Sequence, residues 1–299
     1  MSVELFENER HRLRSIAYRI VGTPDDADDV VQDAWLRFSM VDVESIDNLP
    51  AWLTTVTSRL AIDRLRSSSK RREDYVGPWL SDPLDIEPST DDGPDDTALL
   101  VESISLGFMA VLERVSPLER AVFILHDVFA YPLAEVAGII ERSPAATRQL
   151  AKRARDHVQE GRTRFEPNPA DVEQLTELLL GAAINGDVET LKSFLASDVV
   201  HISDGGPNYR AARAPIVGPD RVARFFTNLA KRWEPTMEAH VVRANGQPAM
   251  YMTNNGEPFM LTVANWVDGK VAAGYAVRNP DKLAAFHRAW QAGLTGDSD

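Results

Sequence analysis

In the first part of the chain, apolar residues recur at intervals of three and four positions, which is the period of an amphipathic α-helix. Residues 25–38 show this pattern, and the apolar positions are Ala27, Val30, Val31, Ala34 and Phe38. Most of the other positions are acidic, so we expect a negative outer face. A second amphipathic helix is predicted from Pro50 onward, because proline suits the first turn of a helix.

Residues 132–158 predict a helix-turn-helix. A short helix runs to Ile140, and Ser143-Pro144 starts a second helix with serine as N-cap and proline in the first turn. The outward positions of that second helix are Arg148, Gln149, Lys152 and Arg155. Such side chains suit phosphates and base edges in a major groove, whereas the alternative is a solvated basic face on a helical hairpin. Glu141 and Arg142 stand where such turns commonly carry glycine and an apolar residue.

Beyond residue 170 the pattern changes to two helices followed by short strands. The first helix ends at Asn185-Gly186-Asp187, and the strands are expected at 199–202, 237–243, 249–253, 259–267 and 271–278. Three pairs favour tight turns between the later strands: Asn245-Gly246, Asn255-Gly256 and Asp268-Gly269. This order predicts an α+β domain with a curved antiparallel meander. It is similar to the NTF2-like cone, whose pocket is able to bind a ligand or to catalyse.

The composition of the 299 residues is that of a globular protein, with 44% hydrophobic and 26% charged residues. Cysteine is absent, which excludes disulfide frameworks, thiolate nucleophiles and iron–sulfur clusters. No apolar run approaches the roughly 18 residues of a membrane span, and the N-terminus lacks the apolar core of a signal peptide. We therefore expect a cytoplasmic protein without membrane contact.

Charge is strongly segregated along a chain whose formal net charge is −13. One basic block lies between Arg59 and Arg72, and a second lies between Arg142 and Arg155. Between them runs an acidic stretch rich in proline, typical of a linker. Pro167 and Pro169 mark a second boundary. The expected organisation is a first module at 1–75, a linker at 76–97, a second module at 98–165 and a C-terminal domain at 170–299.

The residues offer few signs of a catalytic or metal site. The six histidines have no close ligand spacing, so no metal and no cofactor are expected. An enzymatic reading would assign the acid–base role to His201, Asp204 or His240 in the pocket of the C-terminal domain. The alternative is that these are structural histidines and a turn aspartate, because Asp-Gly-Gly is ordinary turn chemistry.

Taken in order, these segments resemble the extracytoplasmic-function sigma factors over nearly the whole chain. Residues 28–37 (DDVVQDAWLR) resemble the helix that docks on the clamp coiled coil of core RNA polymerase. An acidic face suits that basic partner. The resemblance implies that the polymerase-binding residues are Asp26, Asp29, Gln32, Asp33 and Leu36.

The two basic blocks resemble the promoter-binding segments of that family. Residues 52–56 (WLTTV) and the following arginines resemble the part that melts and reads the minus-ten element, where extruded bases need stacking and phosphate contacts. The residues implied there are Trp52, Arg59, Asp63, Arg64, Arg66 and Arg71. Residues 143–151 resemble a helix that reads the minus-thirty-five element. The residues implied there are Ser143, Arg148, Gln149, Lys152, Arg153 and Arg155.

The C-terminal extension resembles that of a sigma-factor subgroup with a SnoaL-like domain. Residues 79–84 (WLSDPL) resemble the linker motif of the subgroup, and 204–208 (DGGPN) resemble its DGGGK motif, with Asn208 in place of lysine. Residues 279–283 (NPDKL) match its terminal motif. We expect the extension to dock on the linker and the first module, in place of a separate anti-sigma protein. The residues expected at the contact are Trp79, Leu80, Pro83, Asp204, Asn279, Pro280, Asp281 and Lys282.

The resulting prediction is a multi-domain promoter-specificity subunit without catalytic residues of its own. Its fold would be two all-α sigma-factor domains, the second with the helix-turn-helix, followed by an α+β NTF2-like cone. Its expected partners are core RNA polymerase, through the clamp coiled coil and the flap, promoter DNA, and a small ligand in the C-terminal pocket. The alternative is a small-molecule-sensing or cyclase- or isomerase-like cone fused to a DNA-binding module.

Overall fold

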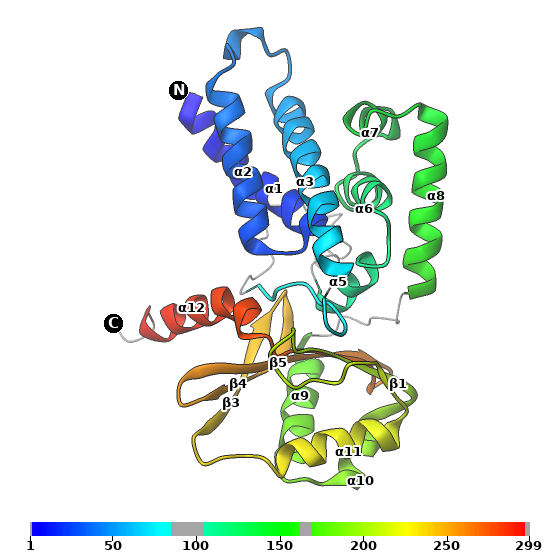
Figure 1. The fold of residues 1–299 in the computed structure, drawn as a ribbon, viewed down its shortest axis with the longest axis vertical. Helices are drawn as coiled ribbons and strands as arrows, with labels where there is room; N and C mark the ends of the chain where they lie inside the picture. Colours follow the sequence, from blue (N-terminus) through cyan, green and yellow to red (C-terminus); the bar gives the residue numbers. More distant parts are fainter. Residues whose placement is uncertain (1, 74, 85–104, 162–168, 297–299) are drawn as a thin grey trace. The chain divides into compact units, whose positions relative to one another are not determined.

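The computed structural model describes residues 2–73, 75–84, 105–161 and 169–296, which divide into two compact units (Figure 1). The helical unit holds the described residues up to 73 and those from 111 to 161. The C-terminal unit holds residues 75–84, 105–110 and 169–296. No helix within these described ranges is long and apolar enough to cross a membrane.

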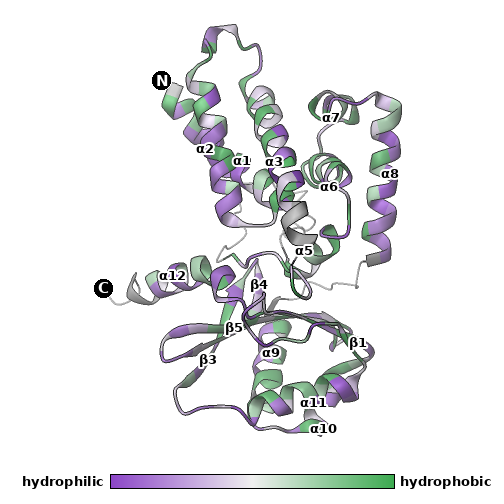
Figure 2. Cartoon of the chain, in the orientation of Figure 1, coloured by the Kyte–Doolittle hydropathy of each residue, from purple (hydrophilic) through white to green (hydrophobic). Residues whose placement is uncertain are grey.

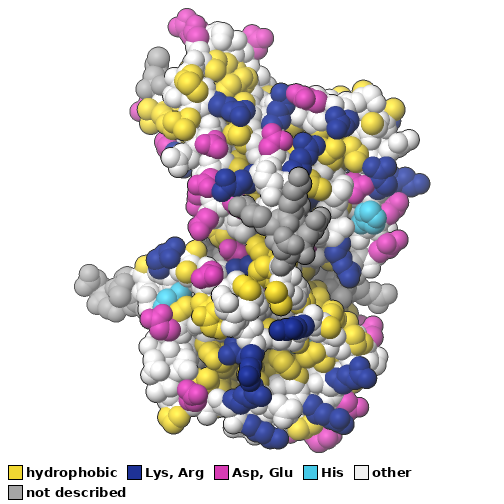
Figure 3. Space-filling model, in the orientation of Figure 1, with side chains coloured by type: hydrophobic (Ala, Val, Ile, Leu, Met, Phe, Trp, Pro, Cys, Tyr) yellow, Lys and Arg dark blue, Asp and Glu magenta, His cyan; other side chains and the backbone are white. Residues whose placement is uncertain are grey.

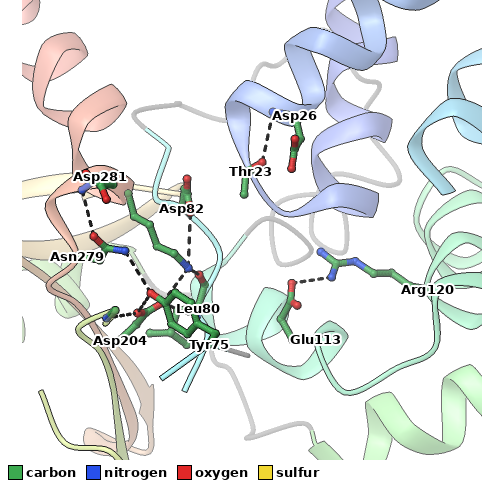
Figure 4. Close-up of polar contacts among 12 residues, drawn as sticks. Thr23, Asp26, Tyr75, Leu80, Asp82, Glu113, Arg120, Asp204, Asn279 and Asp281 are labelled. Atoms are coloured by element: carbon green, nitrogen blue, oxygen red, sulfur yellow. Dashed lines mark hydrogen bonds and ion pairs between the residues drawn. The ribbon is translucent and has the colours of Figure 1, made fainter. Parts of the chain in front are cut away.

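The helical unit begins with three mutually packed helices, α1 (Ser2–Val21), α2 (Pro24–Ser39) and α3 (Leu49–Glu73), with a short 3₁₀ turn η1 (Val43–Ser45) before α3. Thr23 caps α2, because its hydroxyl accepts a hydrogen bond from the backbone N–H of Asp26 at 3.3 Å (Figure 4). The helix predicted at 25–38 is confirmed, and all five of its apolar positions are buried. An aromatic cluster joins the three helices and consists of Phe6, Trp35, Phe38 and Trp52.

The predicted helix-turn-helix is confirmed in the second part of the helical unit. Helix α5 (Leu106–Leu112) leads from the C-terminal unit, which holds its residues up to 110, into the helical unit. It is followed by α6 (Pro117–Phe123), the π-helical turn η3 (Ile124–Val128), α7 (Leu133–Ile139) and α8 (Pro144–Gly161). Glu141 has a φ of 55°, so this residue adopts the left-handed conformation for which such turns commonly use glycine. The inward face of α8 is buried at Thr147, Leu150, Ala151, Ala154 and Val158. Figure 2 shows hydrophilic and hydrophobic positions alternating along α8.

A six-stranded sheet forms the centre of the C-terminal unit, in the order β2-β1-β6-β5-β4-β3. Its strands are β1 (Leu195–Asp204), β2 (Ile216–Val217), β3 (Met237–Ala244), β4 (Gln247–Asn254), β5 (Glu257–Val267) and β6 (Lys270–Val277). All three predicted turn pairs have positive φ at both residues, as type I′ turns require. The antiparallel meander from β3 to β6 is confirmed, but β1 pairs with β6 in parallel.

The two faces of this sheet carry separate apolar cores, because side chains alternate along each strand. Helices α9 (Pro169–Ile184), α10 (Val188–Phe194) and α11 (Pro219–Ala230) pack on one face, where Val199 and Trp266 are buried. Helix α12 (Pro280–Gly296) packs on the other face through Leu283 and Phe286, against Tyr251. The α+β cone expected from the sequence is therefore present.

Two pieces of the chain before the C-terminal domain also belong to this sheet. Leu80 and Leu106 are 1% and 0% exposed, and both lie in the core beneath α12. A Cβ atom at Gly107 would lie 2.4 Å from Nδ2 of Asn265, so this turn of α5 sits close against β5. The expected division at 76–97 and 98–165 therefore differs from the observed one, because apolar burial attaches residues 75–84 and 105–110 to the C-terminal unit. The acidic residues from 85 to 97 lie outside the described residues.

Candidate functional site

Helix α2 presents a polar outer face with one large apolar side chain on it. Asp29, Gln32 and Asp33 are exposed, and the Leu36 side chain on the same surface is 50% exposed. Asp26 is half-buried and faces Arg64 of α3, whose Nε donates to it at 2.6 Å. The second carboxylate bound by Arg64 is Asp29, at 2.7 Å from Nη2. Asp26 and Asp29, both assigned to polymerase binding, are thus paired with Arg64, which is assigned to promoter DNA.

Arg59 of α3 is also occupied within the helical unit. Its guanidinium donates to the carbonyls of Ile139 and Gly138 at 2.9 Å each, and it lies 3.2 Å from the Glu141 carboxylate. These carbonyls belong to the C-terminal end of α7, where a cation is favoured by the helix dipole. Arg59 therefore connects α3 to the helix-turn-helix.

The other residues assigned to the minus-ten element differ in their exposure to solvent. Arg66 and Asp63 are exposed and form a pair at 3.3 Å one turn apart on α3. Trp52 is half-buried in the aromatic cluster, with its ring centre 6.2 Å from that of Phe38. Arg71 lies in α3, but its side chain is outside the described part of the structure.

The polar side chains of α8 form two groups, one exposed to solvent and one bound to carboxylates of neighbouring elements. Arg148, Gln149 and Lys152 are exposed, and among the described residues Arg148 and Lys152 form no ion pair. By contrast, the arginines of the bound group donate to carboxylates at 2.6 Å, Arg153 to Glu119 and Arg155 to Asp127. Ser143, which is also assigned to the minus-thirty-five element, is the N-cap of α8. Its hydroxyl accepts a hydrogen bond from the backbone N–H of Ala146 at 3.3 Å.

In the C-terminal unit, the assigned residues converge on the buried carboxylate of Asp204. This side chain is 0% exposed at the end of β1 and accepts hydrogen bonds from the Tyr75 hydroxyl (2.5 Å) and the Leu80 N–H (2.9 Å) (Figure 4). The N–H of Gly206 adds a third at 3.1 Å. Both Tyr75 and Leu80 precede Asp204 by more than 120 positions in the sequence.

Lys282 of α12 completes this cluster with a buried positive charge. Its Nζ lies 2.8 Å from Asp204 Oδ2, 2.5 Å from the Leu80 carbonyl and 3.8 Å from the Asp82 carboxylate. The same ammonium lies 3.1 Å from the centre of the Trp79 ring, as in a cation–π contact. We call Tyr75, Leu80, Asp204, Asn279 and Lys282 the linker clamp.

The remaining assigned residues support the linker clamp or lie beside it. Asn279 donates from Nδ2 to the Tyr75 hydroxyl at 3.2 Å and accepts the N–H of Asp281 at 3.2 Å. Asp281 itself is exposed, and Pro280 is the first residue of α12. Pro83 is buried and precedes Leu84, whose N–H and carbonyl bond to Asn245 at 2.9 and 2.8 Å.

Tyr75 was not anticipated from the sequence. Burial and the neighbouring Asp204 carboxylate raise the pKa of its hydroxyl far above the ordinary value, so it stays a proton donor. A tyrosine before a proline-containing segment belongs to no recognisable motif, so the sequence alone did not indicate that Tyr75 contacts Asp204. A second feature that was missed is the positive charge of residues 205–233.

His201, Asp204 and His240, the three candidate acid–base residues, do not line the cavity between α11 and the sheet. A cavity of about 400 Å³ lies between α11 and the sheet and is lined by Ser203, Arg210, Ala211, Ala212, Phe225, Asn228, Leu229, Arg232, Met260, Ala276 and Arg278. Asp204 is held by the linker clamp, His201 is buried, and the ring of His240 lies 4.9 Å from that of Trp290. In the ranges that the structure covers, no group of three or more His, Asp or Glu side chains is placed to hold a metal.

Burial lowers the pKa of His201 to about 4, so this histidine is neutral in the folded protein above that pH. Below pH 6.5 this histidine binds a proton in the unfolded chain but not in the folded chain. The free energy of unfolding therefore falls as the pH falls from 6.5 toward 4. We predict a loss of about 2 kcal/mol by pH 4.5 from this residue alone.

Urea unfolding of the His201→Leu variant at pH 7 and pH 4.5 checks this prediction. The variant should lose less stability between the two pH values than the wild type, whereas His11→Leu, at an exposed site on α1, should lose as much as the wild type. Equal losses in all three proteins would contradict it.

Comparison with known proteins agrees with this architecture. Residues 5–71 match the family model for Sigma-70 region 2, and residues 105–158 match that for Sigma-70 region 4. The ECF RNA polymerase sigma factor SigJ of Mycobacterium tuberculosis is 39% identical over 95% of this chain and 93% of its own length. The probable ECF sigma factor SigI of the same species is 34% identical over 92% of each chain.

A solved structure extends the similarity to the whole fold. The crystal structure of M. tuberculosis SigJ superimposes with a TM-score of 0.74 and 36% identity, covering 95% of this chain and 98% of that one. The likeness thus includes the two helical modules and the α+β extension. The chain belongs to the ECF RNA polymerase sigma factors.

Proposed function

We propose that the residues singled out above divide the work of an ECF sigma factor between three surfaces. Sigma factors bind core RNA polymerase and promoter DNA, and the face of α2 is our candidate for the polymerase contact. Its support is the combination of exposed Gln32 and Asp33 with the exposed Leu36, since a polar rim around an apolar side chain is typical of a protein interface and the Asp33 carboxylate suits a basic partner.

We propose that α8 reads the upstream promoter element through Arg148, Gln149 and Lys152. The observation that carries this assignment is that these side chains project from a well-packed helix and are not engaged by carboxylates in the described structure. Arg and Gln present forked donors and acceptors to base edges, and Lys suits a phosphate. Arg153 and Arg155 are then assigned chiefly to holding α8 against α6 and η3.

We propose that α3 contacts the element nearer the start site, with Arg66 on its exposed face. Arg59 and Arg64 would have to leave the Ile139 carbonyl and the Asp26 carboxylate before they bind DNA. In the free chain these internal pairs would compete with promoter binding.

Alanine substitutions on α8 and α3 test this division. Arg148→Ala is expected to weaken transcription from promoters that depend on the upstream element by about 1–3 kcal/mol, or roughly 5- to 150-fold. Arg66→Ala should act on the element nearer the start site. The measurement is transcription by reconstituted polymerase from promoters altered at either element.

As a control, the activity of each variant is measured on each of the altered promoters. Arg148→Ala should have little further effect on a promoter whose upstream element is already destroyed, and Arg66→Ala should keep its full effect there. If both variants lost activity equally on both altered promoters, the assignment of α8 and α3 would be wrong.

We propose that the C-terminal unit restrains the linker and so regulates this sigma factor in cis, without a separate anti-sigma protein. Support comes from Leu80, which is part of the apolar core beneath α12, and from the linker clamp, which engages both its N–H and its carbonyl. These contacts hold residues 75–84 on the C-terminal unit, and we infer that they limit the freedom of the linker. Release of the linker clamp would therefore change transcription while leaving the choice of promoter intact.

A further inference from the structure

The segment 205–233 is strongly basic in an otherwise acidic protein. It has one acidic residue, Asp220, and that carboxylate is bound by Lys192 at 2.6 Å. Its basic residues are Arg210, Arg213, Arg221, Arg224, Lys231 and Arg232. Figure 3 shows Lys and Arg side chains gathered on the visible face of the C-terminal unit, with hydrophobic side chains between them. A local concentration of this sign in a chain of net charge −13 favours anions at this face.

Two of these arginines, Arg210 and Arg232, line the 400 Å³ cavity together with Arg278, which follows β6. The rest of the lining is mostly apolar, and Phe225, Leu229 and Met260 contribute large side chains. A volume of this size accommodates a small organic molecule. The cavity thus combines an apolar wall with three cationic groups.

Arg278 is the most deeply set of the three. Its guanidinium lies 4.4 Å from the centre of the Phe259 ring, and Nη1 donates to the carbonyl of Arg210 at 2.8 Å. Burial and the charge of Arg232 lower the pKa of Arg278, as expected for two guanidinium groups that share a site. Among the described residues, no carboxylate forms an ion pair with Arg210, Arg232 or Arg278. Within the described ranges, the three cations of the cavity are therefore without a carboxylate partner.

We propose that this cavity binds a small organic anion, in which an aromatic or alicyclic body packs on Phe225, Leu229 and Met260 and a carboxylate meets Arg232 and Arg278. A planar carboxylate matches the fork of a guanidinium, and such charge-assisted hydrogen bonds are stronger than neutral ones.

The loop 205–213 connects this cavity to the linker clamp. Arg210, Ala211 and Ala212 line the cavity, and they also line a second hollow of about 420 Å³ against Val76, Gly77 and Pro78. At Gly205 a Cβ atom would lie 2.6 Å from both Cβ of Ala211 and the Tyr209 carbonyl, so the loop is closely packed.

Arg278 provides a second connection, because its N–H donates to the Asp204 carbonyl at 2.7 Å and its neighbour Asn279 contacts Tyr75. An anion that moves Arg278 or Arg210 would therefore displace groups that hold the linker. This coupling rests on the proposed regulation by the linker clamp, whereas the binding site itself does not.

Calorimetric titration of the full chain with 2-naphthoate tests the site. This probe carries a carboxylate on an aromatic body, and 2-naphthamide is its neutral counterpart of the same shape. We expect one 2-naphthoate bound per chain and an affinity for 2-naphthamide lower by about tenfold or more. No binding of 2-naphthoate at millimolar concentration, or equal affinity for both compounds, would overturn the proposal.

Variants of the same charge change locate the bound probe. Arg232→Gln, at an exposed side chain, should weaken 2-naphthoate binding by about tenfold. Arg278→Gln should do the same if the variant unfolds like the wild type. Arg221→Gln lies in the same basic segment but outside the cavity lining, so its affinity should be unchanged. Equal losses in Arg232→Gln and Arg221→Gln would indicate general attraction to the basic face and would overturn the site.

Hydrogen exchange of the full chain with saturating 2-naphthoate tests the coupling. The backbone N–H of Leu80, which donates to Asp204, should exchange at a different rate when the probe is bound. An unchanged rate would overturn the coupling while the binding site remains. The calorimetric titration and the hydrogen-exchange experiment use neither polymerase nor DNA. Their results therefore do not depend on whether the linker clamp affects transcription.

Discussion

Replacing Lys282 by methionine is expected to lower the free energy of unfolding of the C-terminal unit by about 3 kcal/mol, because loss of one partner of a buried ion pair leaves the other charge uncompensated. The Lys282 and Asp204 side chains are 5% and 0% exposed. Methionine retains most of the apolar volume, so the main loss is the ammonium. Asp204 keeps its hydrogen bonds from Tyr75 and Leu80, but the Leu80 carbonyl loses the lysine donor.

Urea unfolding measures this loss, and limited proteolysis reports on the linker itself. In Lys282→Met, residues 76–84 should become accessible to proteases at concentrations that leave the wild type intact. The neighbouring Asp281→Asn variant is the control, because that side chain is exposed. A change in Lys282→Met of less than about 1 kcal/mol, the range of exposed ion pairs, would contradict the linker clamp.

The double variant Asp204→Asn/Lys282→Met separates the ion pair from its surroundings. Removing both charges leaves no uncompensated ion, so the double variant should be more stable than the sum of the two single losses predicts. Strict additivity would mean that Asp204 and Lys282 do not act as a pair.

Replacing Arg120 by methionine is expected to lower the stability of the helical unit by about 3 kcal/mol for the same reason. Arg120 is 1% exposed on α6 and donates to the Glu113 carboxylate at 2.7 Å (Figure 4) and to the Arg19 carbonyl at 2.8 Å. The second bond joins α6 to the end of α1, so this side chain links the two helical modules.

Chemical unfolding monitored by circular dichroism measures the effect of Arg120→Met, with Arg114→Met as the exposed control. The control should differ from the wild type by less than about 0.5 kcal/mol. A comparable loss in both variants would show that the buried contacts of Arg120 are not responsible.

Local signals in the sequence account for much of the fold. The spacing of Val30, Val31 and Ala34 determines the buried side of α2, and the Ser143-Pro144 pair determines where α8 begins. The turns at Asn245-Gly246 and Asn255-Gly256 follow from the left-handed backbone that these residues tolerate. Each signal acts within a few residues, which is why a single sequence reveals it.

Contacts between distant segments were harder to anticipate. The average composition of residues 76–97 is acidic and rich in proline, which conceals the apolar Leu80 and Leu84 that anchor its first part. The parallel pairing of β1 with β6 depends on the path of the whole chain rather than on any strand. Likewise, no pattern indicates that Arg59 would reach the carbonyls of α7.

Run-off transcription with purified core RNA polymerase, on a promoter selected from random DNA, tests the central claim most directly. The polymerase alone should give no defined start, and addition of the full chain should give transcripts from one start site. Lys282→Met should change the amount of transcript without moving the start. Absence of specific transcripts with the wild-type chain, or an unchanged amount with Lys282→Met, would contradict the account of a sigma factor restrained through its own linker.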